Sequence, residues 1–346
     1  MTESQFFNLP IPLQLESGAT LPAVQVAYHT FGTLNAAQDN VVWVCHALTA
    51  NADVLAWWPG LFGPGFLFDP ADYFIVCANV LGSCYGSTGP LTPVSAESEP
   101  LYHEFPLLTT RDMVAAHDQL RQHLGLSKIH TLIGGSLGGQ QALEWAIQQP
   151  ALFENLVVLA TNAQHSPWGI AFNEAQRLAI QADQTYYSAT PEGGQQGLKA
   201  ARAMALLSYR SYEAYGTTQA EITNEKLDGF RASTYQQYQG DKLVARFNAY
   251  TYVTLSKAMD AHNVGRGRGG VAAALSQIQA RTLVVAITSD VLFPPLEQQL
   301  LARHIPGAQY AEMSSRFGHD GFLIETVQIT HFLERFYSRT LAHQQA

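Results

Sequence analysis

The side chain best suited to nucleophilic chemistry in this sequence is a serine enclosed by glycines. Ser136 lies in the stretch Gly134–Gly139, which follows the apolar β-type run Ile129–Ile133 and precedes the helix-type run Gln140–Ile147. A strand, a Gly-x-Ser-x-Gly turn and a helix in this order predict a nucleophile elbow, in which glycines let the two backbones nearly touch and the serine hydroxyl projects above the sheet. The alternative is a glycine-rich turn that opens a helix and binds phosphate. The flanking elements favour Ser136 as a nucleophile.

Two further residues have the types and the order that a serine nucleophile needs. Asp290 follows the β-rich run Thr282–Ile287, and His319 lies in the glycine-flanked loop Phe317–Leu323. Because the carboxyl ends of parallel strands meet at one edge of a sheet, both residues are expected beside Ser136. The chain order serine, aspartate, histidine is that of an α/β-hydrolase triad. Taken alone, Asp290 is also consistent with a turn or a helix cap, and His319 with an ordinary loop histidine.

Acyl chemistry at a serine also needs hydrogen-bond donors for the oxyanion that forms. The loop His46–Ala50 follows the first buried parallel strand, and in this fold that loop supplies one backbone N–H donor. The second donor is the residue after the nucleophile. We therefore predict an oxyanion hole made by the N–H groups of Leu48 and Leu137. His46 is expected to brace this loop and not to titrate in catalysis.

Composition restricts the class of protein. The chain has 346 residues, of which 47% are hydrophobic and 14% are charged, which predicts a well-filled globular core without disorder. The net charge of −9 and the lack of a basic stripe argue against nucleic-acid binding. The three cysteines have no CxxC spacing, which indicates reduced thiols. Without a signal-like segment at Met1–Gln5 or a long apolar run, we expect a cytoplasmic protein that spans no membrane.

The elements that must position these residues alternate along the chain. Strand-type runs, mostly apolar throughout, are separated by helix-type runs, which predicts a mostly parallel sheet covered by helices on both faces, the α/β-hydrolase fold. The predicted strands are Asn40–His46, Tyr73–Asn79, Ile129–Ile133, Leu156–Ala160 and Thr282–Ile287, with a hairpin of Leu13–Glu16 and Ala23–Tyr28 before them and a helix at Thr110–Leu124.

A change of pattern marks an insertion in this core. Residues 171–261 show helical periodicity without a convincing strand, for example at Ile170–Ala182, Gly197–Tyr209 and Lys242–Met259. We therefore predict a core in two parts, residues 1–163 and 279–346, and an all-helical lid at residues 164–278, between the sixth and seventh strands. The glycine-rich stretch Gly265–Gly270 is interpreted as a solvated linker from the lid to the core, with a phosphate-binding loop as the alternative.

Beyond these elements, the chain resembles the MetX-type homoserine O-acetyltransferases over nearly its whole length. Three departures are Ala50 for the usual glycine, Leu137 for the usual methionine, and Ser83 within Gly82–Cys84, where the family more often has a second glycine. The segments that carry the resemblance are the elbow, His46–Thr49, Trp57–Gly65, Asn79–Pro90, Thr110–Val114, His165–Glu174, Lys257–Asp260, Ser289–Asp290, Leu292–Pro295 and Gly318–Asp320.

The resemblance implies a ping-pong transfer of an acyl group from acyl-CoA to an amino-acid hydroxyl. It implies that Arg202, with Tyr209 seven residues on, binds the carboxylate of the acceptor, and that Asp320 holds its amino group. An arginine suits a carboxylate because its guanidinium can bind both oxygens. Arg210 is the competing candidate for the carboxylate. By spacing alone, Arg202 is also consistent with a solvated helix charge and Asp320 with a loop acid or cap.

The expected activity is therefore homoserine O-acetylation, an activation step in methionine biosynthesis. The substrates would be L-homoserine and acetyl-CoA or another acyl-CoA, and we expect no cofactor and no metal. Succinyl-CoA as donor or serine as acceptor stays open, since a few pocket side chains separate these reactions. A serine esterase or thioesterase and a non-catalytic binding protein are the other classes considered. The resemblance also implies a homodimer formed through the lid helices.

Overall fold

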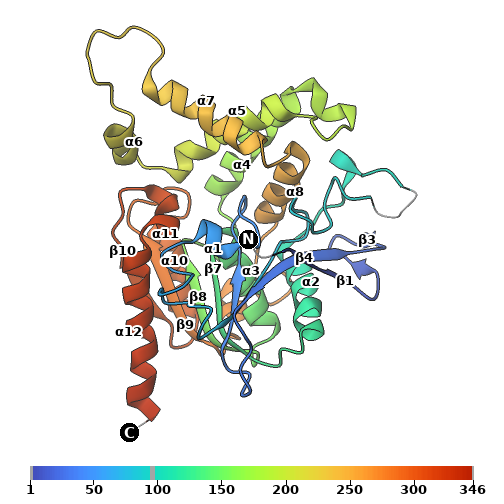
Figure 1. Cartoon of the computed structure of the whole chain (residues 1–346), viewed down its shortest axis with the longest axis vertical. Helices are drawn as coiled ribbons and strands as arrows, with labels where there is room; N and C mark the ends of the chain where they lie inside the picture. Colours follow the sequence, from blue (N-terminus) through green and yellow to red (C-terminus); the bar gives the residue numbers. More distant parts are fainter. Residues whose placement is uncertain (1–2, 94–97, 345–346) are drawn as a thin grey trace.

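An eight-stranded sheet forms the centre of the computed structural model, which describes residues 3–93 and 98–344, with only the backbone for residues 339–344 (Figure 1). Residues 1–2, 94–97 and 345–346, which the predicted core bounds include, lie outside this part of the chain. The strand order is β1-β4-β6-β5-β7-β8-β9-β10. The strands are β1 (Gln5–Asn8), β4 (Gln25–Phe31), β5 (Val41–Cys45), β6 (Phe74–Ala78), β7 (Ile129–Gly135), β8 (Phe153–Leu159), β9 (Arg281–Ile287) and β10 (Gln309–Met313).

Most neighbouring strands of this sheet run in the same direction. β1 pairs with β4 and β4 with β6 in antiparallel fashion, and every pair from β6 to β10 is parallel. A long parallel sheet needs cover on both faces, and its strands are accordingly apolar throughout: all five residues of β5 are buried. The predicted α/β-hydrolase architecture with a mostly parallel sheet is confirmed.

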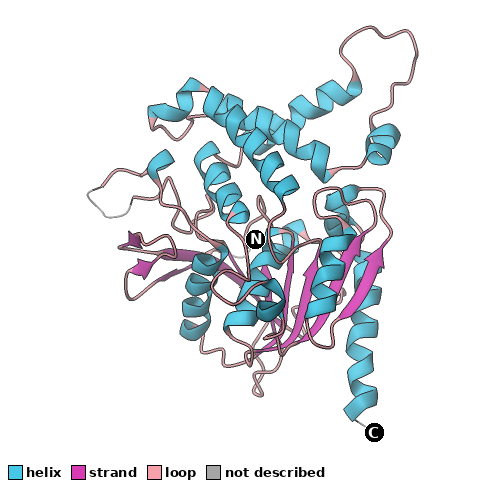
Figure 2. Ribbon diagram, turned by 180° about the vertical axis from the view of Figure 1, so that it is seen from behind, coloured by secondary structure: helices cyan, strands magenta, loops and turns pink. Residues whose placement is uncertain are grey.

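Helices lie on both faces of the sheet (Figure 2). Side chains that alternate along the strands divide the core into two layers. In β5, Trp43 and Cys45 face one layer, whereas Val42 and Val44 face the other. The first layer is covered by α2 (Thr110–His123), α3 (Leu137–Gln148) and α10 (Pro295–His304), and the second by α1 (Val54–Trp57) and α12 (Thr326–Gln344). The start of α2 is fixed by a capping box, in which the Thr109 side chain accepts from the Asp112 N–H and the Asp112 carboxylate accepts from the Thr109 N–H.

Helices lie above the carboxyl edge of the sheet, where the chain leaves β8 and returns to β9 (Figure 1). β8 and β9 are the sixth and seventh strands of the eight-stranded sheet in chain order. We call this segment the lid. Its helices are α4 (Pro167–Ala182), the 3-10 turn Gln184–Ser188, α5 (Gln195–Tyr209), α6 (Tyr212–Thr218), α7 (Arg231–Val244), α8 (Ala249–Asp260) and α9 (Val271–Leu275). The remaining short elements are 3-10 turns at Tyr102–Glu104 and Gly318–Asp320 and the helix α11 (Gly321–Ile324).

Two local predictions are wrong. The segment Leu13–Glu16 does not pair with Ala23–Tyr28: its β2 (Leu13–Gln14) pairs with β3 (Thr20–Leu21), which lies just past the Ser17-Gly18 turn. Residues from Gln25 onward join the main sheet instead, because β4 finds partners on both sides in β1 and β6.

The stretch Lys242–Met259 is not one helix. It divides into the end of α7 at Val244 and the start of α8 at Ala249. The break occurs where Asn248 caps α8, since its side chain accepts a hydrogen bond of 2.8 Å from the Thr251 N–H.

The Gly265–Gly270 stretch is held by ion pairs with the core. Arg266 contacts Glu16 at 2.8 Å, and Arg268 contacts the buried Glu144 at 2.5 Å. Arginines already bound to carboxylates are poorly suited to hold a phosphate. These contacts favour the interpretation of this stretch as the connection that returns the lid to the core.

Candidate active site

Close backbone packing shapes the turn that carries Ser136. A Cβ placed on Gly134 would lie 2.3 Å from the Gly138 carbonyl oxygen, and one on Gly138 would lie 2.0 Å from the Cys45 carbonyl oxygen. Only glycine fits at these positions, because neither backbone can move away. Ser136 itself has φ +57° and ψ −126°, a conformation that L-residues rarely adopt. The turn between β7 and α3 therefore has the geometry of the predicted elbow.

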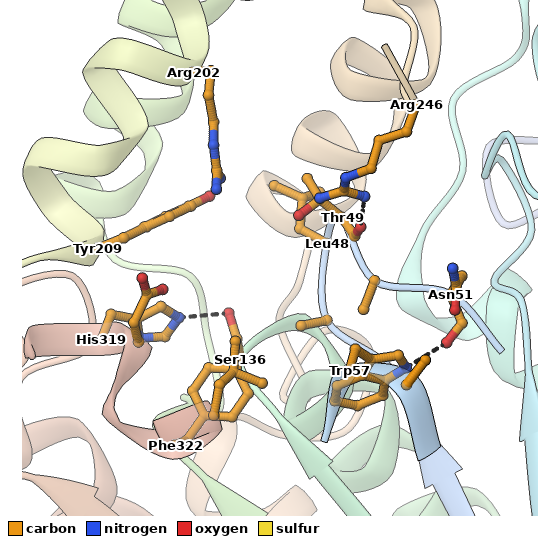
Figure 3. A pocket seen from close by; sticks show the side chains of 15 residues that line it. Leu48, Thr49, Asn51, Trp57, Ser136, Arg202, Tyr209, Arg246, His319 and Phe322 are labelled. Atoms are coloured by element: carbon orange, nitrogen blue, oxygen red, sulfur yellow. Dashed lines mark hydrogen bonds between the residues drawn. The ribbon is translucent and has the colours of Figure 1, made fainter. Parts of the chain in front are cut away.

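The structure brings the three residues predicted as a triad into one hydrogen-bonded chain, of which Figure 3 shows the contact between Ser136 and His319. The Ser136 Oγ lies 2.9 Å from His319 Nε2, and His319 Nδ1 lies 2.7 Å from Asp290 Oδ2. All three residues are buried. In this arrangement the histidine can take the serine proton while the aspartate fixes the orientation of the ring.

Neighbouring groups hold the aspartate and the histidine in place. The second carboxylate oxygen of Asp290 accepts hydrogen bonds from the N–H groups of Leu292 and Phe293, at 2.8 and 2.9 Å. The Phe293 ring also stacks on the His319 ring, with centroids 5.0 Å apart and an interplanar angle of 25°. Both residues of the pair are thus oriented by the same short segment after β9.

The segments that carry Leu48 and Leu137 meet beside the nucleophile. Leu137 is the first residue of α3, so its N–H has no partner within the helix. The Gln141 amide links the two segments, since it donates to the carbonyls of both His46 and Leu137. The role of Leu48 and Leu137 as oxyanion donors remains a prediction.

His46 supports this loop from beneath. Its Nδ1 bonds to the Ala47 carbonyl at 2.9 Å, and its Nε2 accepts from the Val80 N–H at 3.0 Å. Burial lowers the pKa of His46 to about 4, so the imidazole is neutral near pH 7. These contacts agree with a bracing role.

A cavity of about 360 Å³ opens above Ser136 (Figure 3). The loop that carries Leu48 forms one wall and the lid helix α5 lies opposite, with His319 and Ser136 at the base. The lining residues are Ala47, Leu48, Thr49, Ala50, Asn51, Ala56, Trp57, Ser136, Arg202, Tyr209, Arg246, His319, Asp320, Phe322 and Leu323.

The three predicted acceptor-binding residues all line this cavity. The Arg202 guanidinium carbon lies 5.6 Å from the centroid of the Tyr209 ring, and its Nε is buried without a hydrogen-bond partner among the described residues. Arg210, the competing candidate, is not a lining residue and instead pairs with Asp320, with 2.7 Å from Nε to Oδ2. Of the two arginines, Arg202 is therefore the one available to an anion in the cavity.

Sequence reasoning missed a third arginine at the site. Arg246 lies between α7 and α8, and its Nη1 donates to the Thr49 carbonyl and to the Tyr85 hydroxyl, both at 2.5 Å. It thus connects the lid to the loop that carries Leu48. Nothing in its sequence context marks this residue, because a lone arginine at the end of a helical stretch is a common surface feature.

A polar network lies beside the triad. Glu297, in the first turn of α10, accepts from the Asn162 amide at 2.8 Å, and Asn162 accepts from Gln140 at 3.0 Å. Burial is the main cause that raises the pKa of Glu297 to about 7, and the charge of Asp290 adds to it. Glu297 is therefore a carboxyl group that changes charge near neutral pH.

The cysteine that is least buried is a poor nucleophile at neutral pH. Burial raises the pKa of Cys84, the cysteine that is not fully buried, to about 11, so its reactive thiolate is scarce at neutral pH.

Within residues 3–93 and 98–344, no group of three or more His, Cys, Asp or Glu side chains is placed to hold a metal ion. None of the helices in the same ranges is long and apolar enough to cross a membrane.

Comparison with known proteins identifies similar sequences over nearly the full length. A family model described as alpha/beta hydrolase fold matches residues 40–326. The homoserine O-acetyltransferase of Cyclobacterium marinum is 51% identical over 333 residues, which cover 96% of this chain and 95% of the relative. That of Chlorobaculum tepidum is 46% identical over 96% of this chain and 94% of its own length.

Solved structures with the same fold include enzymes of more than one kind. Homoserine O-acetyltransferase from Staphylococcus aureus is 31% identical and superposes with a TM-score of 0.80, covering 96% of this chain and 95% of its own. Esterase E22 superposes with a TM-score of 0.88 at 21% identity, covering 97% of this chain and 100% of its own. At that identity, the similarity to the esterase establishes the fold alone.

Proposed function

Since the chain belongs to the homoserine O-acetyltransferase family, which has the α/β-hydrolase fold, we propose that it transfers an acetyl group from acetyl-CoA to the side-chain hydroxyl of L-homoserine, a step toward methionine. The observation that carries the proposal is the hydrogen-bonded Ser136–His319–Asp290 chain at the base of a cavity whose opposite wall presents Arg202. The nucleophile Ser136 can carry the acyl group from donor to acceptor. The guanidinium of Arg202 on the opposite wall suits an acceptor that has a carboxylate.

The first half-reaction forms an acyl-serine. His319 Nε2 takes the proton from Ser136 Oγ, which attacks the thioester carbonyl, and the CoA thiolate leaves with that proton. The Leu48 and Leu137 N–H groups would bind the oxyanion. The loss of one such donor typically costs about 3–4 kcal/mol of transition-state stabilisation.

The second half-reaction returns the enzyme to its starting state. His319 removes the proton from the acceptor hydroxyl, the new alkoxide attacks the acyl-serine, and Ser136 leaves with the proton from His319. A transferase must favour this hydroxyl over water. Lid residues line the cavity, and a lid favours such a preference where it excludes solvent and positions the acceptor.

Charged groups in the cavity favour an amino-acid acceptor over a plain ester. Arg202 would bind the acceptor carboxylate with Tyr209 beside it, and Asp320 would bind the ammonium. An esterase for neutral esters needs neither charge. Succinyl-CoA as donor and serine as acceptor are the close alternatives, because neither changes the triad.

The test follows the acyl group. Wild-type protein mixed with acetyl-CoA alone should gain one acetyl mass on the peptide that contains Ser136, and Ser136→Ala should gain none and lose both transfer and thioester hydrolysis. An acetyl group on Cys84 would refute the assignment of the nucleophile. A matrix of acetyl-, propionyl- and succinyl-CoA against homoserine and serine, followed by CoA release, then identifies the preferred pair.

A cytoplasmic homodimer is the proposed form of the enzyme. The lid exposes large apolar side chains around α6 and the connection to α7: Tyr212 is 96%, Leu227 93% and Ile222 88% exposed. A second copy that packs on this surface would cover them. Leu227→Asp should shift the protein toward the monomer in sedimentation velocity, whereas Val327→Asp, at an 83% exposed position on α12, should not. A wild-type monomer at micromolar concentration would refute the dimer.

A further inference from the structure

One segment of the lid is seated directly on the loop that carries His319. Arg210 is the C-cap residue directly after α5, and Asp320 ends the 3-10 turn Gly318–Asp320. Their side chains form an ion pair of 2.7 Å between Nε and Oδ2, and they are only 26% and 18% exposed. A pair with this degree of burial is less screened by solvent than a surface pair.

Two further contacts fix the same junction. The Ser211 hydroxyl donates to the Arg316 carbonyl, directly after the ion-paired arginine. Gly318 has φ +66°, and a Cβ placed on it would lie 3.0 Å from the backbone of Tyr209, Arg210 and Ser211 alike. The lid backbone thus lies against the loop one residue before His319, and the ion pair sits between two backbone contacts.

The contact with Arg210 involves one oxygen of the Asp320 carboxylate. Oδ2 lies 2.7 Å from Arg210 Nε, an ion pair without hydrogen-bond geometry because this N–H has no hydrogen-bond partner among the described residues. Asp320 also lines the cavity. Arg202, within α5, makes no ion pair with Asp320 and lies over the Tyr209 ring. Arg202 is therefore available to an anion, whereas Arg210, which follows the helix, is already paired with an acid.

We propose that Arg210 is a positioning residue that sets the specificity of the enzyme for an acceptor with an ammonium group. It would hold Asp320 so that Oδ1 faces the acceptor nitrogen, and it would do so only while the lid is seated on the His319 loop. This inference rests on the proposed function, because it concerns the acceptor that the acyl-serine meets. The first half-reaction involves no ammonium group and does not need the pair.

The experiment compares Arg210→Gln, Arg210→Lys, Asp320→Asn and the double variant Arg210→Gln/Asp320→Asn. Acceptors are homoserine and 4-hydroxybutyrate, which is homoserine without its amino group. We expect Arg210→Gln to raise the KM for homoserine at least tenfold and to reduce the preference for homoserine over 4-hydroxybutyrate by a similar factor. The burst of CoA release with acetyl-CoA alone should stay within about twofold of wild type. Arg210→Lys should recover part of the loss, because it restores the charge without the planar geometry.

A double-mutant cycle separates orientation from general damage. If Arg210 acts through Asp320, the double variant should be no worse with homoserine than Asp320→Asn alone. The control is Lys199→Gln in α5, which removes an ion pair of 2.6 Å with Asp241 of α7, away from the cavity. It should leave the acceptor preference unchanged.

The inference is overturned if the two single effects add, if the acceptor preference survives in Arg210→Gln, or if Arg210→Gln loses the burst together with acceptor binding. The last result would identify the contact as a general support of the lid. Failure of the wild-type protein to use homoserine at all, with an intact burst, would instead refute the proposed function.

Discussion

The backbone of the nucleophile yields a prediction about stability that is separate from its role in catalysis. Ser136 is held at φ +57° and ψ −126°, where a residue with a Cβ is strained by about 1–3 kcal/mol. Glycine adopts this conformation without strain but loses more backbone entropy on folding, at a cost of about 0.5–1 kcal/mol. Ser136→Gly and Ser136→Ala both remove the hydroxyl and its 2.9 Å bond to His319. The difference between the unfolding free energies of these two variants therefore reports the effect of the backbone conformation at residue 136.

We expect Ser136→Gly to unfold at a higher urea concentration than Ser136→Ala, by an amount that corresponds to about 0.5–2 kcal/mol. In a chain of this size, the melting temperatures should differ by about 1–3 °C. Both variants should be inactive in the acetyl-CoA burst assay, which checks that the comparison concerns stability alone. A glycine variant that is less stable than the alanine variant would show that the turn stores no strain at Ser136.

Three further changes test other parts of the site. Gly138→Ala should destabilise the fold by at least about 3 kcal/mol in chemical denaturation, because its Cβ would lie 2.0 Å from a backbone carbonyl oxygen. Gly216→Ala in α6 is the control and should be neutral or stabilising, because a Cβ there has no atom within 4 Å. Equal effects of the two substitutions would contradict the packing argument. Arg202→Ala should cost about 2–5 kcal/mol in kcat/KM for the acceptor and keep the acetyl-CoA burst, and loss of the burst with an unchanged acceptor KM would transfer the role to another residue. The raised pKa of Glu297 means that the folded state holds its proton more tightly, so the contribution of this group to stability is highest below about pH 4.5 and is lost as the pH rises through about 7. Glu297→Gln should remove this loss and be more stable than wild type by about 1–2 kcal/mol at about pH 8, measured by denaturation across pH; a constant difference between the two proteins would exclude Glu297 as its source.

The sequence was most informative where a backbone constraint restricts the residue type. The glycines around Ser136 are required by contacts of 2.0–2.3 Å, so their spacing alone predicted the elbow and its flanking strand and helix. Asp290 and His319 were found because each follows a segment whose place at the carboxyl edge of the sheet is fixed by topology. Their hydrogen bonds could then be expected from the chain order.

Pairings between distant segments were harder to predict. The partner of β4 depends on β1 and β6 and not on the nearby turn, and β10 was missed because only Met313 of its five residues is buried. The contact of Arg210 with Asp320 and that of Arg246 with Thr49 join lid to core across long chain separations. Charged residues at helix ends have no periodic pattern, so their partners appear only in the folded chain.

The base of the lid has a consequence in terms of polymer physics. The chain leaves β8 and returns to β9, which are neighbours in the sheet, and a β-bridge between Gln164 and Asn263 joins the start of the lid to the segment that follows α8. The strand pairing and the bridge therefore close the lid segment at its base, whatever the number of residues beyond the bridge. Because closure entropy grows only with the logarithm of loop length, even a doubling of the segment would cost about 0.6 kcal/mol. Extra residues between α6 and α7, where the chain is most exposed, should thus be tolerated by the core, and the lid can change in length and sequence while the sheet and its triad remain as they are.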